Sequence, residues 1–439
     1  MAFYLNGIHT PHRKNTIKQP TVKMPAPSTV IIPMAMHIGK PAIPCVKAGD
    51  IVKVGTKIGN ADGKVSSNVY SSVSGKVIKL SDYLLTNGIF TTAVEIESDG
   101  EMSLDDAIHS YAPTNREELI SALENSGIVG LGGAGFPTHF KLDVDPKRIE
   151  HLIINGAECE PYITSDSVTM LKKSDDMAYA LRALNRCLGI SSVVIGIENN
   201  KKEPILSMQK MASSISEFKV SVKKLPSVYP QGGEKVLVYH TTGKRIPANK
   251  LPIDVGSIVL NCTTLAEIGK FLRTGVPLVE KCVTVDGGAV KNPQNVIVPI
   301  GTSLNDLFEF CGGLTEKPDK IIYGGPMMGV TVIDGNSSVL KNTNAVLALT
   351  HKEARLPATT ACIRCGACVN TCPFGLAPVS IAEAYERKDT EELSALCINT
   401  CMECGCCSFV CPANRPLVQI NKLSKQLLRE EQRKEDKKQ

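Results

Sequence analysis

The chain has 439 residues and a formal net charge of +5; it contains no tryptophan, and aromatic residues make up 5% of it. A weak positive charge and few aromatic side chains argue against a nucleic-acid-binding surface, and the length predicts several domains. The sequence has neither an apolar run long enough to span a bilayer nor the apolar core of a secretory signal. We therefore expect a cytosolic, multidomain protein with no direct membrane span.

Residues 1–24 are expected to form an N-terminal arm, and residues 25–98 a small β-rich domain. The segments VKAGDIVKVG and YSSVSGKV combine short strand patterns with glycine turns, and they resemble the half-barrel repeats of biotinyl and lipoyl domains. This resemblance implies a barrel-sandwich hybrid. Lys64 precedes Gly75 by eleven residues, as a lipoyl-bearing lysine precedes its glycine. Because the expected acidic neighbour is only loosely present in ADGKV, we prefer the alternative of an exposed lysine in a hairpin.

The segment GLGGAGF (residues 130–136) has the spacing G-x-G-x-x-G, carried by Gly130, Gly132 and Gly135. That spacing marks a dinucleotide-binding turn when a strand precedes it and a helix follows. Here a helical pattern, NREELISALENS, precedes it, and Pro137 comes two residues after the last glycine. The segment therefore lacks the Rossmann context, although bare glycine backbone can approach a flat or phosphate-bearing ligand without Cβ clashes.

After this glycine segment, strand and helix patterns alternate, which predicts a Rossmann-like α/β domain with a parallel sheet. Predicted strands cover residues 149–155, 191–197 and 218–225, and predicted helices cover residues 167–189 and 204–215. Ligands of such sheets bind beyond the carboxyl ends of the strands. Asn155, Glu158 and Glu160 follow the first strand, so we expect them at the edge of a site.

Three segments, GLGGAGFPTHFKL, INGAECEPYITSD and YPQGGEKVLV, resemble in order and spacing the NADH- and FMN-binding flavoprotein subunit of respiratory complex I. The resemblance implies an FMN- and NAD(H)-binding domain over residues 115–250, with the glycine segment along the flavin and nicotinamide and a lysine at the FMN phosphate. The cofactor-binding residues that it implies are Gly130, Gly132, Gly133, Gly135, Phe136, Lys141, Asn155, Glu158, Glu160 and Glu234, with Asn261 and Thr264 as a weaker match. Ala157 and Gly233 depart from the family, which has an acidic residue at each place.

Residues 255–335 contain two strand patterns, VTV and NVIVPI, followed by the helical pattern SLNDLFEF. They resemble the soluble-ligand-binding β-grasp (SLBB) module that follows the flavin domain in relatives of complex I. The resemblance leaves two roles open for this module, ligand binding and packing against neighbouring domains.

Ten of the sixteen cysteines follow residue 360, and clustered cysteines in a cytosolic protein indicate a metal site. Residues 362–373 and 401–412 each have the spacing C-x2-C-x2-C-x3-C-P, the ferredoxin run for a [4Fe–4S] cluster. In two-cluster ferredoxins the fourth cysteine of each run ligates the other cluster. We assign Cys362, Cys365, Cys368 and Cys411 to cluster 1, and Cys401, Cys404, Cys407 and Cys372 to cluster 2.

The pattern between the two runs is helical, so residues 350–425 are predicted to form an α-helical, two-cluster ferredoxin domain. A pair of zinc knuckles is the alternative, but zinc sites rarely have this spacing twice. Cys397 and Cys406 fall outside the ligand spacing and are expected to pack near the clusters as spectators. Residues 426–439 mix charges of both signs, and we expect a solvated helix end rather than a contact to a membrane surface.

The domain order, the start NGIHTPHRK and the segment MAMHIGKPAIPCVKAGD together resemble the RnfC family, which belongs to the Rnf electron-transport complexes. The resemblance implies a peripheral subunit at the cytoplasmic face of the cell membrane, with FMN, NAD(H) and two [4Fe–4S] clusters as cofactors. Its partners would be the membrane and iron–sulfur subunits of that complex, with ferredoxin as the ultimate source or acceptor of electrons. A flavin is needed there because nicotinamide moves a hydride whereas the clusters move single electrons.

Two further hypotheses come from different classes of protein. One is a soluble NADH-dependent cobalamin reductase, which shares NGAECEP and the glycine segment; the N-terminal barrel-sandwich module favours the Rnf subunit. The other is a non-enzymatic iron–sulfur relay or scaffold. In the preferred interpretation the protein positions cofactors and supplies no separate acid–base residues. A general acid–base pair of Glu158 and Glu160 is less favoured than their hydrogen bonding to flavin or ribose.

Overall fold

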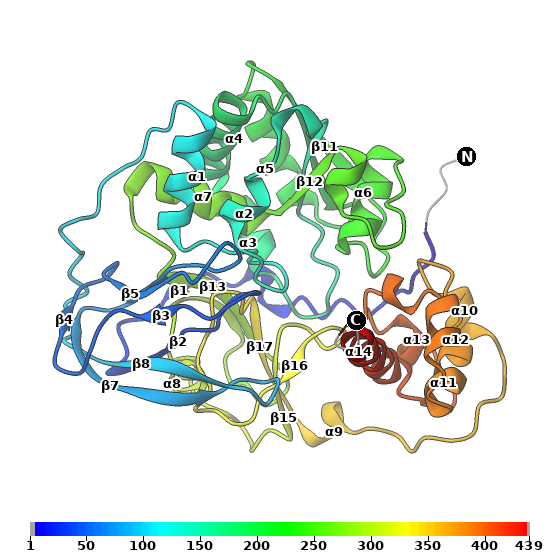
Figure 1. Cartoon of the computed structure of the whole chain (residues 1–439). Coiled ribbons are helices and arrows are strands. Elements are labelled where there is room, and N and C mark those ends of the chain that lie inside the picture. The colour runs from blue at the N-terminus through cyan, green and yellow to red at the C-terminus, as the bar shows by residue number, and fades with distance from the viewer. Residues whose placement is uncertain (1–4, 437–439) are drawn as a thin grey trace.

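The computed structural model describes residues 5–436 of the chain. Its strands form four sheets, and a group of helices follows them at the C-terminal end (Figure 1). Along the chain come a two-sheet β domain, a parallel sheet with helices, a mixed sheet and a cysteine-rich helical segment. None of the helices between residues 5 and 436 has both the length and the apolar sequence that crossing a membrane requires.

The N-terminal β domain is formed by β2 (Thr29–Pro33), β3 (Ile43–Pro44), β4 (Ile51–Val52), β5 (Lys57–Asn60), β6 (Val69–Tyr70), β7 (Gly75–Leu84) and β8 (Phe90–Ser98). They make two antiparallel sheets, β2–β8–β7–β4 and β3–β5–β6. Val77, Val94 and Ile96 point inward and join the largest apolar core. The fold is the predicted barrel-sandwich hybrid. Lys64 is exposed in the loop that joins β5 to β6.

The central α/β domain is built on β9 (His151–Asn155), β10 (Ser192–Glu198), β11 (Lys219–Leu225) and β12 (Ser257–Asn261). All neighbouring strands are parallel, in the order β11–β10–β9–β12, as the alternating pattern predicted. Its helices are α1 (Arg116–Ser126), α2 (Thr138–Leu142), α3 (Ser165–Lys172), α4 (Ser174–Leu188), α5 (Lys202–Ser213), α6 (Glu234–Thr242) and α7 (Cys262–Thr274). Leu152 and Ile154 pack with residues of α4 and α7, whereas Ile153 packs with Leu237 of α6, so helices cover both faces of β9.

Two sequence expectations for this domain need correction. The expected boundary at 250–255 is wrong for the sheet, because β12 pairs with β9 and therefore belongs to the α/β domain. The predicted helix over residues 167–189 is two helices, α3 and α4, which meet at Lys173. The Lys173 side chain forms an ion pair with Glu267 of α7, with Nζ 2.5 Å from Oε1. Periodicity did not reveal the break, since both helices bury apolar residues at helical spacing.

The mixed sheet contains β1 (Val22–Lys23), β13 (Glu280–Asp286), β14 (Gln294–Pro299), β15 (Lys320–Tyr323), β16 (Val330–Thr331) and β17 (Ala345–Leu349), in the order β1–β14–β13–β17–β15–β16. The α8 helix (Leu304–Phe310) buries Leu304, Leu307 and Phe308 in the same core as β13 and β14. This is the predicted β-grasp arrangement. It continues past the expected end at residue 335, because β17 pairs with β13 and β15.

The C-terminal segment consists of α9 (His351–Ala354), α10 (Ala367–Asn370), α11 (Pro378–Glu386), α12 (Thr390–Ala395), α13 (Cys406–Phe409) and α14 (Leu417–Asp436). The helical stretch predicted between the cysteine runs is interrupted, because Lys388 has a φ of +55° and the Asp389 side chain caps α12. The α14 helix carries the charged tail onward as a helix; residues 437–439 of that predicted tail lie outside the described part. Short 3-10 helices occur at Asn15–Lys18, Pro146–Arg148, Pro252–Val255 and Ile398–Thr400.

The N-terminal arm connects three parts of the molecule. Ile8 and Tyr229 exchange two backbone hydrogen bonds, at 2.8 and 2.9 Å, which attach the arm to the α/β domain. The Gly7 carbonyl accepts a hydrogen bond from Thr371 of the cysteine-rich segment at 3.2 Å. The arm then continues into β1, which pairs with β14 of the mixed sheet. Residues 5–23 therefore run across the junction of these domains.

Candidate cofactor sites

The glycine loop (residues 130–136) closes on itself at the surface of the α/β domain. The Gly130 N–H donates to the Phe136 carbonyl at 2.8 Å, and Val129 and Pro137 pair on either side of the loop. The loop lies between α1 and α2, so the predicted absence of a preceding strand is confirmed. It is not a Rossmann turn.

Gly132 and Gly133 present exposed backbone with different surroundings. A Cβ on Gly132 would lie 2.5 Å from Asn261 Nδ2, whereas a Cβ on Gly133 would meet no atom within 4 Å. Real Cβ atoms do not make contacts this short. Only glycine at position 132 therefore allows the loop to lie so close to the Asn261 side chain. At Gly133 the bare backbone faces open space.

Thr264 and Lys281 hold the glycine loop through Leu131. The Leu131 N–H donates to Thr264 Oγ1 at 2.9 Å, and Lys281 Nζ donates to the Leu131 carbonyl at 2.8 Å. Lys281 is buried, and burial lowers its pKa to about 8. The sequence match had pointed to Thr264. It missed Lys281, which comes from β13 of the mixed sheet and shares no local pattern with the loop.

Asn261 ends β12 and caps α7. Its Oδ1 accepts hydrogen bonds from the N–H groups of Thr263 and Thr264 at 2.9 and 3.3 Å, and its Nδ2 donates to Asp166 at 2.7 Å. Asp166 also accepts from the Thr263 hydroxyl at 2.7 Å. Burial, followed by the charge of Glu158, raises the pKa of Asp166. The sequence analysis missed Asp166 as a site residue, although it ends the segment INGAECEPYITSD.

The Asn155 loop (residues 155–163) begins where β9 ends, as predicted. Asn155 Nδ2 donates to the Gly232 carbonyl at 2.9 Å, and Asn155 Oδ1 accepts from the Ala157 N–H at 3.1 Å. The first contact joins the loop to the segment YPQGGEK, which precedes and begins α6. Two of the three segments that carry the resemblance to the complex I flavoprotein therefore meet at the carboxyl end of β9.

The Glu158 carboxylate points into the protein, where other residues of the chain hydrogen-bond to it. It accepts hydrogen bonds from the Asp166 N–H and the Ser167 hydroxyl, both at 2.8 Å, and Lys201 Nζ lies 3.4 Å away. Glu158 is 5% exposed and the Lys201 side chain 7% exposed. These contacts fix the start of α3. The predicted direct contact of this carboxylate to a flavin stays a prediction, and the observed contacts assign it a role in shaping the loop.

Glu160 contacts the loop that follows β15. Its two carboxylate oxygens accept from the N–H groups of Met327 and Met328, at 3.1 and 2.8 Å. Burial raises the pKa of Glu160 to about 7 in spite of these hydrogen bonds. Glu158 and Glu160 therefore face different neighbours, an arrangement that agrees with the preference against an acid–base pair.

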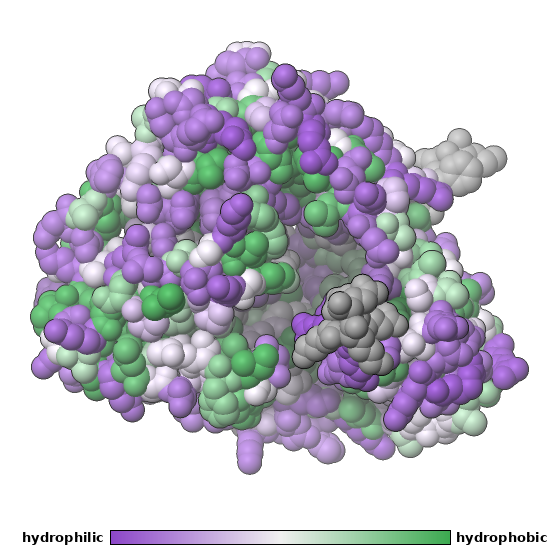
Figure 2. All heavy atoms as spheres, viewed as in Figure 1, coloured by the Kyte–Doolittle hydropathy of each residue, from purple (hydrophilic) through white to green (hydrophobic). Residues whose placement is uncertain are grey.

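Lys141 and Glu234 form an ion pair across the site. Lys141 lies on α2 and Glu234 begins α6; their Nζ and Oε1 atoms are 2.9 Å apart, and both side chains are partly exposed. The two residues were predicted on separate motifs, and the fold brings them together. Figure 2 shows the molecular face hollowed below α2 and α3, between them and the C-terminal helices. Near the glycine loop, Phe136 packs against the exposed Phe140, with ring centroids 5.8 Å apart.

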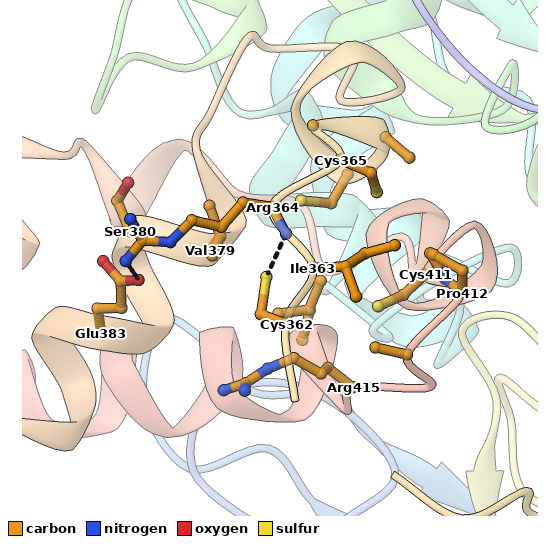
Figure 3. A pocket seen from close by; sticks show the side chains of 15 residues that line it. Cys362, Ile363, Arg364, Cys365, Val379, Ser380, Glu383, Cys411, Pro412 and Arg415 are labelled. Atoms are coloured by element: carbon orange, nitrogen blue, oxygen red, sulfur yellow. Dashed lines mark hydrogen bonds and ion pairs between the residues drawn. The ribbon is translucent and has the colours of Figure 1, made fainter. Parts of the chain in front are cut away.

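A cavity of about 250 Å³ lies between the two cysteine runs and is lined by Cys362, Cys365, Cys368 and Cys411. The side chains of Cys362, Cys365 and Cys411 reach it from two separate segments (Figure 3). The Arg364 N–H donates to Cys362 Sγ at 3.4 Å. These four cysteines are the set predicted for cluster 1, including the cysteine that comes from the other run.

A second cavity is lined by Cys372, Cys401, Cys404 and Cys407, the set predicted for cluster 2. The Glu403 N–H and Asn421 Nδ2 donate to Cys401 Sγ at 3.4 and 3.5 Å. Cys406 also lines this cavity, whereas Cys397 is exposed and lines neither. Within residues 5–436, no group of three or more His, Cys, Asp or Glu side chains converges on a point that would suit a single metal ion.

The second cavity adjoins the loops of the α/β domain. The Tyr229 hydroxyl donates to the Cys404 carbonyl at 2.7 Å. Tyr229, Cys404 and Cys406 are buried in one apolar cluster, against which Cys159 and Met402 pack. The first cavity has a more open wall, since Ile363 in its lining is 69% exposed. The second cysteine set is therefore the inner one with respect to the Asn155 loop.

Three parts of the chain match families of known domains. Residues 3–101 match the RnfC barrel sandwich hybrid domain, residues 123–270 the Nuo51 FMN-binding domain, and residues 282–331 the SLBB domain. The match for the FMN-binding domain includes β12 and most of α7, in agreement with the sheet.

Relatives match the chain over most of its length. One of them, from the Na+-translocating ferredoxin:NAD+ oxidoreductase complex of Acetobacterium woodii, is 40% identical over 389 residues, which cover 88% of this chain and 87% of the relative. The chain belongs to the RnfC family of ion-translocating oxidoreductase complexes. The RnfC relative from the proton-translocating complex of Clostridium ljungdahlii is 39% identical, covering 88% of this chain and 85% of that protein. The relative from the ion-translocating oxidoreductase complex of Rhodobacter capsulatus is 39% identical, covering 97% and 83%.

Membership of the RnfC family confirms the fold prediction. The barrel-sandwich hybrid, the FMN-binding domain and the SLBB domain follow one another as expected, and the cysteine-rich helical segment comes last. An FMN-binding domain is thus part of this chain. The individual cofactor-binding residues remain predictions, which the geometry above sharpens.

Proposed function

We propose that this chain is the NAD(H)-interacting subunit of an ion-translocating ferredoxin:NAD+ oxidoreductase and that it holds FMN and two [4Fe–4S] clusters. The observation that carries the proposal is the arrangement of the cysteine cavities. Each cavity gathers four predicted ligands from both runs, and the second cavity adjoins the loops of the FMN-binding domain. The proposed flavin site and the proposed site of cluster 2 would therefore lie next to each other.

The donor sets suit iron–sulfur clusters. Cys362, Cys365, Cys368 and Cys411 would hold cluster 1, and the second cavity would hold cluster 2 through its own four cysteines. The backbone N–H of Arg364 points at Cys362 Sγ, and N–H donors to ligand sulfurs are among the groups that set cluster potentials. Thiolates of this spacing, with such donors, support clusters over a pair of zinc knuckles.

The residues near the glycine loop suit FMN and NAD(H). The exposed backbone at Gly132 and Gly133 gives a flat ring system close access, and Lys141 supplies a positive charge for the FMN phosphate. Glu234 pairs with that lysine, so a phosphate binding there competes with Glu234. Asn155 and the Asn155 loop close the same edge of the sheet. Thr264, Asn261 and Lys281 support the glycine loop from behind.

A bound flavin supplies the conversion between two-electron nicotinamide chemistry and single-electron cluster chemistry. The chain contributes position and electrostatics. Its glycine loop leaves the ring face accessible, and the Tyr229 hydroxyl ties Cys404 to the segment YPQGGEK. These contacts support cluster 2 as the inner cluster and cluster 1 as the outer one, which is the side where an electron-carrying partner would dock.

The proposed setting is the cytoplasmic face of the cell membrane, where the other Rnf subunits would bind this chain and ferredoxin would be the ultimate source or acceptor of electrons. The relatives named as Na+-translocating and proton-translocating match the chain about equally, at 40% and 39% identity.

Anaerobic purification followed by titration with NADH tests the function. We expect bound flavin and iron in the isolated chain, bleaching of the flavin absorbance by NADH, and EPR signals of reduced clusters where their potentials permit. A chain that holds iron but neither flavin nor a response to NADH would be the non-enzymatic relay. Recovery as a freely soluble enzyme that reduces cobalamin, independent of membranes, would favour the reductase instead.

A further inference from the structure

Lys14 of the N-terminal arm enters the Asn155 loop from outside the FMN-binding domain. Its Nζ donates to the carbonyls of Glu158, Glu160 and Ile163, at 2.9, 2.7 and 2.5 Å. All three carbonyls belong to the Asn155 loop. Hydrogen bonds to one ammonium therefore hold six consecutive residues of this loop, 158–163, in place.

The contacts leave Lys14 no free donor. A lysine ammonium has three N–H donors and no acceptor, and three carbonyls occupy them. Burial lowers the pKa of Lys14 to about 8, so the side chain still carries its charge at neutral pH. Lys14 consequently does not bind a ligand itself, and any effect on a cofactor must pass through the shape and the charge of the loop.

Neighbouring hydrogen bonds fix the arm on both sides of Lys14. Ile8 is paired with Tyr229, and the Tyr162 N–H donates to the His12 carbonyl at 3.1 Å. On the other side, the Thr16 hydroxyl contacts the Thr164 hydroxyl. These contacts hold the arm, and with it the Lys14 ammonium, in a fixed position next to the loop.

Lys14 also adds positive charge to a group of buried carboxylates under the loop. Glu158 and Glu198 are buried there with Lys201, and both carboxylates interact electrostatically with Lys14, as does Glu160. Without Lys14 this group would be more negative by one charge, which would disfavour an anionic cofactor at the same end of the sheet.

We propose that Lys14 is a positioning residue for the flavin site: it shapes the Asn155 loop and offsets negative charge beneath it. The inference rests on the proposed function, because it takes the Asn155 loop to border bound FMN. It gives the N-terminal arm a role that neither the glycine loop nor the cysteine runs supply.

The test compares Lys14→Met, Lys14→Ala and Lys270→Met in the full chain reconstituted with FMN. Lys270 is a matched control, because it is also partly buried and pairs with Glu280 at 2.9 Å, away from the Asn155 loop. Losing charge-assisted hydrogen bonds should weaken FMN binding on the order of tenfold to a hundredfold in both Lys14 variants. Hydrogen exchange should rise selectively in residues 155–163, and the absorption spectrum of the remaining bound flavin should shift.

Chemical rescue makes the test specific for the ammonium. Propylamine has the three carbons and the nitrogen that Lys14→Ala lacks, so added propylammonium should restore FMN affinity and the wild-type flavin spectrum. Propanol should restore neither, and propylamine should leave Lys270→Met unchanged. Wild-type FMN affinity in Lys14→Met, or slower loop exchange without rescue by the amine, would overturn the inference. If wild-type protein itself binds no FMN, the proposed function fails as well, and the exchange data then show separately whether Lys14 orders the loop.

Discussion

The cysteine-rich segment and the FMN-binding domain build their sites in opposite ways. The cysteine cavities are lined by residues whose spacing is local, and only the exchange of the fourth cysteine joins the two runs. The proposed flavin site is assembled from segments far apart in the chain, with Lys14 from the arm and Lys281 from the mixed sheet holding its loops. A short motif is therefore enough to predict the cysteine ligands, whereas the residues that support the loops of the proposed flavin site depend on the whole fold.

The largest expected effect comes from breaking the exchange of cysteines. Cys411→Ser should remove the same cluster as Cys362→Ser, and Cys372→Ser the same cluster as Cys401→Ser, because each pair lines one cavity. Iron content should fall from about eight to about four atoms per chain. EPR of the remaining cluster should be alike within each pair and different between pairs. Cys397→Ser, an exposed position outside both cavities, should keep all its iron; spectra grouped by run instead would contradict the exchange.

A smaller loss, in stability rather than cofactor, should follow where the arm meets the α/β domain and the mixed sheet. Glu280 on β13 pairs with Lys270 of α7 at 2.9 Å and with Lys23 of β1 at 2.8 Å. Burial alone would raise its pKa, but these two charges outweigh it and lower the pKa of Glu280 to about 2. Glu280→Gln should therefore cost about 2–3 kcal/mol of unfolding free energy at pH 7.

The pH dependence of that loss has a definite sign. Because the pKa of Glu280 is lower in the folded than in the unfolded chain, its contribution is complete above about pH 4.5 and disappears as the pH falls toward 2. Urea denaturation of the cofactor-free chain should show the wild-type and Glu280→Gln curves converging over this range. A difference that stays constant down to pH 2 would assign the effect to packing.

Gly132 and Gly133 separate support of the glycine loop from contact with its ligand. Gly132→Ala places a Cβ against Asn261, whose side chain is held by Asp166 and by the α7 cap. It should cost about 1–3 kcal/mol of stability. Gly133→Ala meets no atom of the protein, so thermal stability should be unchanged while FMN retention falls. If Gly133→Ala binds FMN normally, the flavin does not lie along that face.

The sequence predicted the parallel sheet and the sets of cysteines that line the two cavities, because each depends on periodicity or on a motif of fixed spacing. It pointed to Asn261 and Thr264 as flavin contacts, and the structure places both residues against the glycine loop. It did not predict Lys14, Asp166 or Lys281 as supports, since each contacts residues that are far away in the sequence, and such contacts leave no local pattern. The place of β12 in the parallel sheet was missed for a related reason. Its pairing with β9 joins segments far apart in the chain, which intrinsic propensity does not encode.

The smallest expected effect concerns the ion pair that joins α2 to α6. Glu234 pairs with the Lys141 ammonium at 2.9 Å, and both side chains are partly exposed. Ion pairs in such a setting contribute about 0–1 kcal/mol to stability. Removing the competitor should therefore tighten FMN binding only a few-fold in Glu234→Gln, while Lys141→Met should weaken it by about tenfold through loss of the phosphate contact. Riboflavin, which has no phosphate, is the control: its affinity should be the same in both variants and in wild type. Equal changes for FMN and riboflavin would remove Lys141 from the phosphate site and leave the loops, rather than this charge, to select the cofactor.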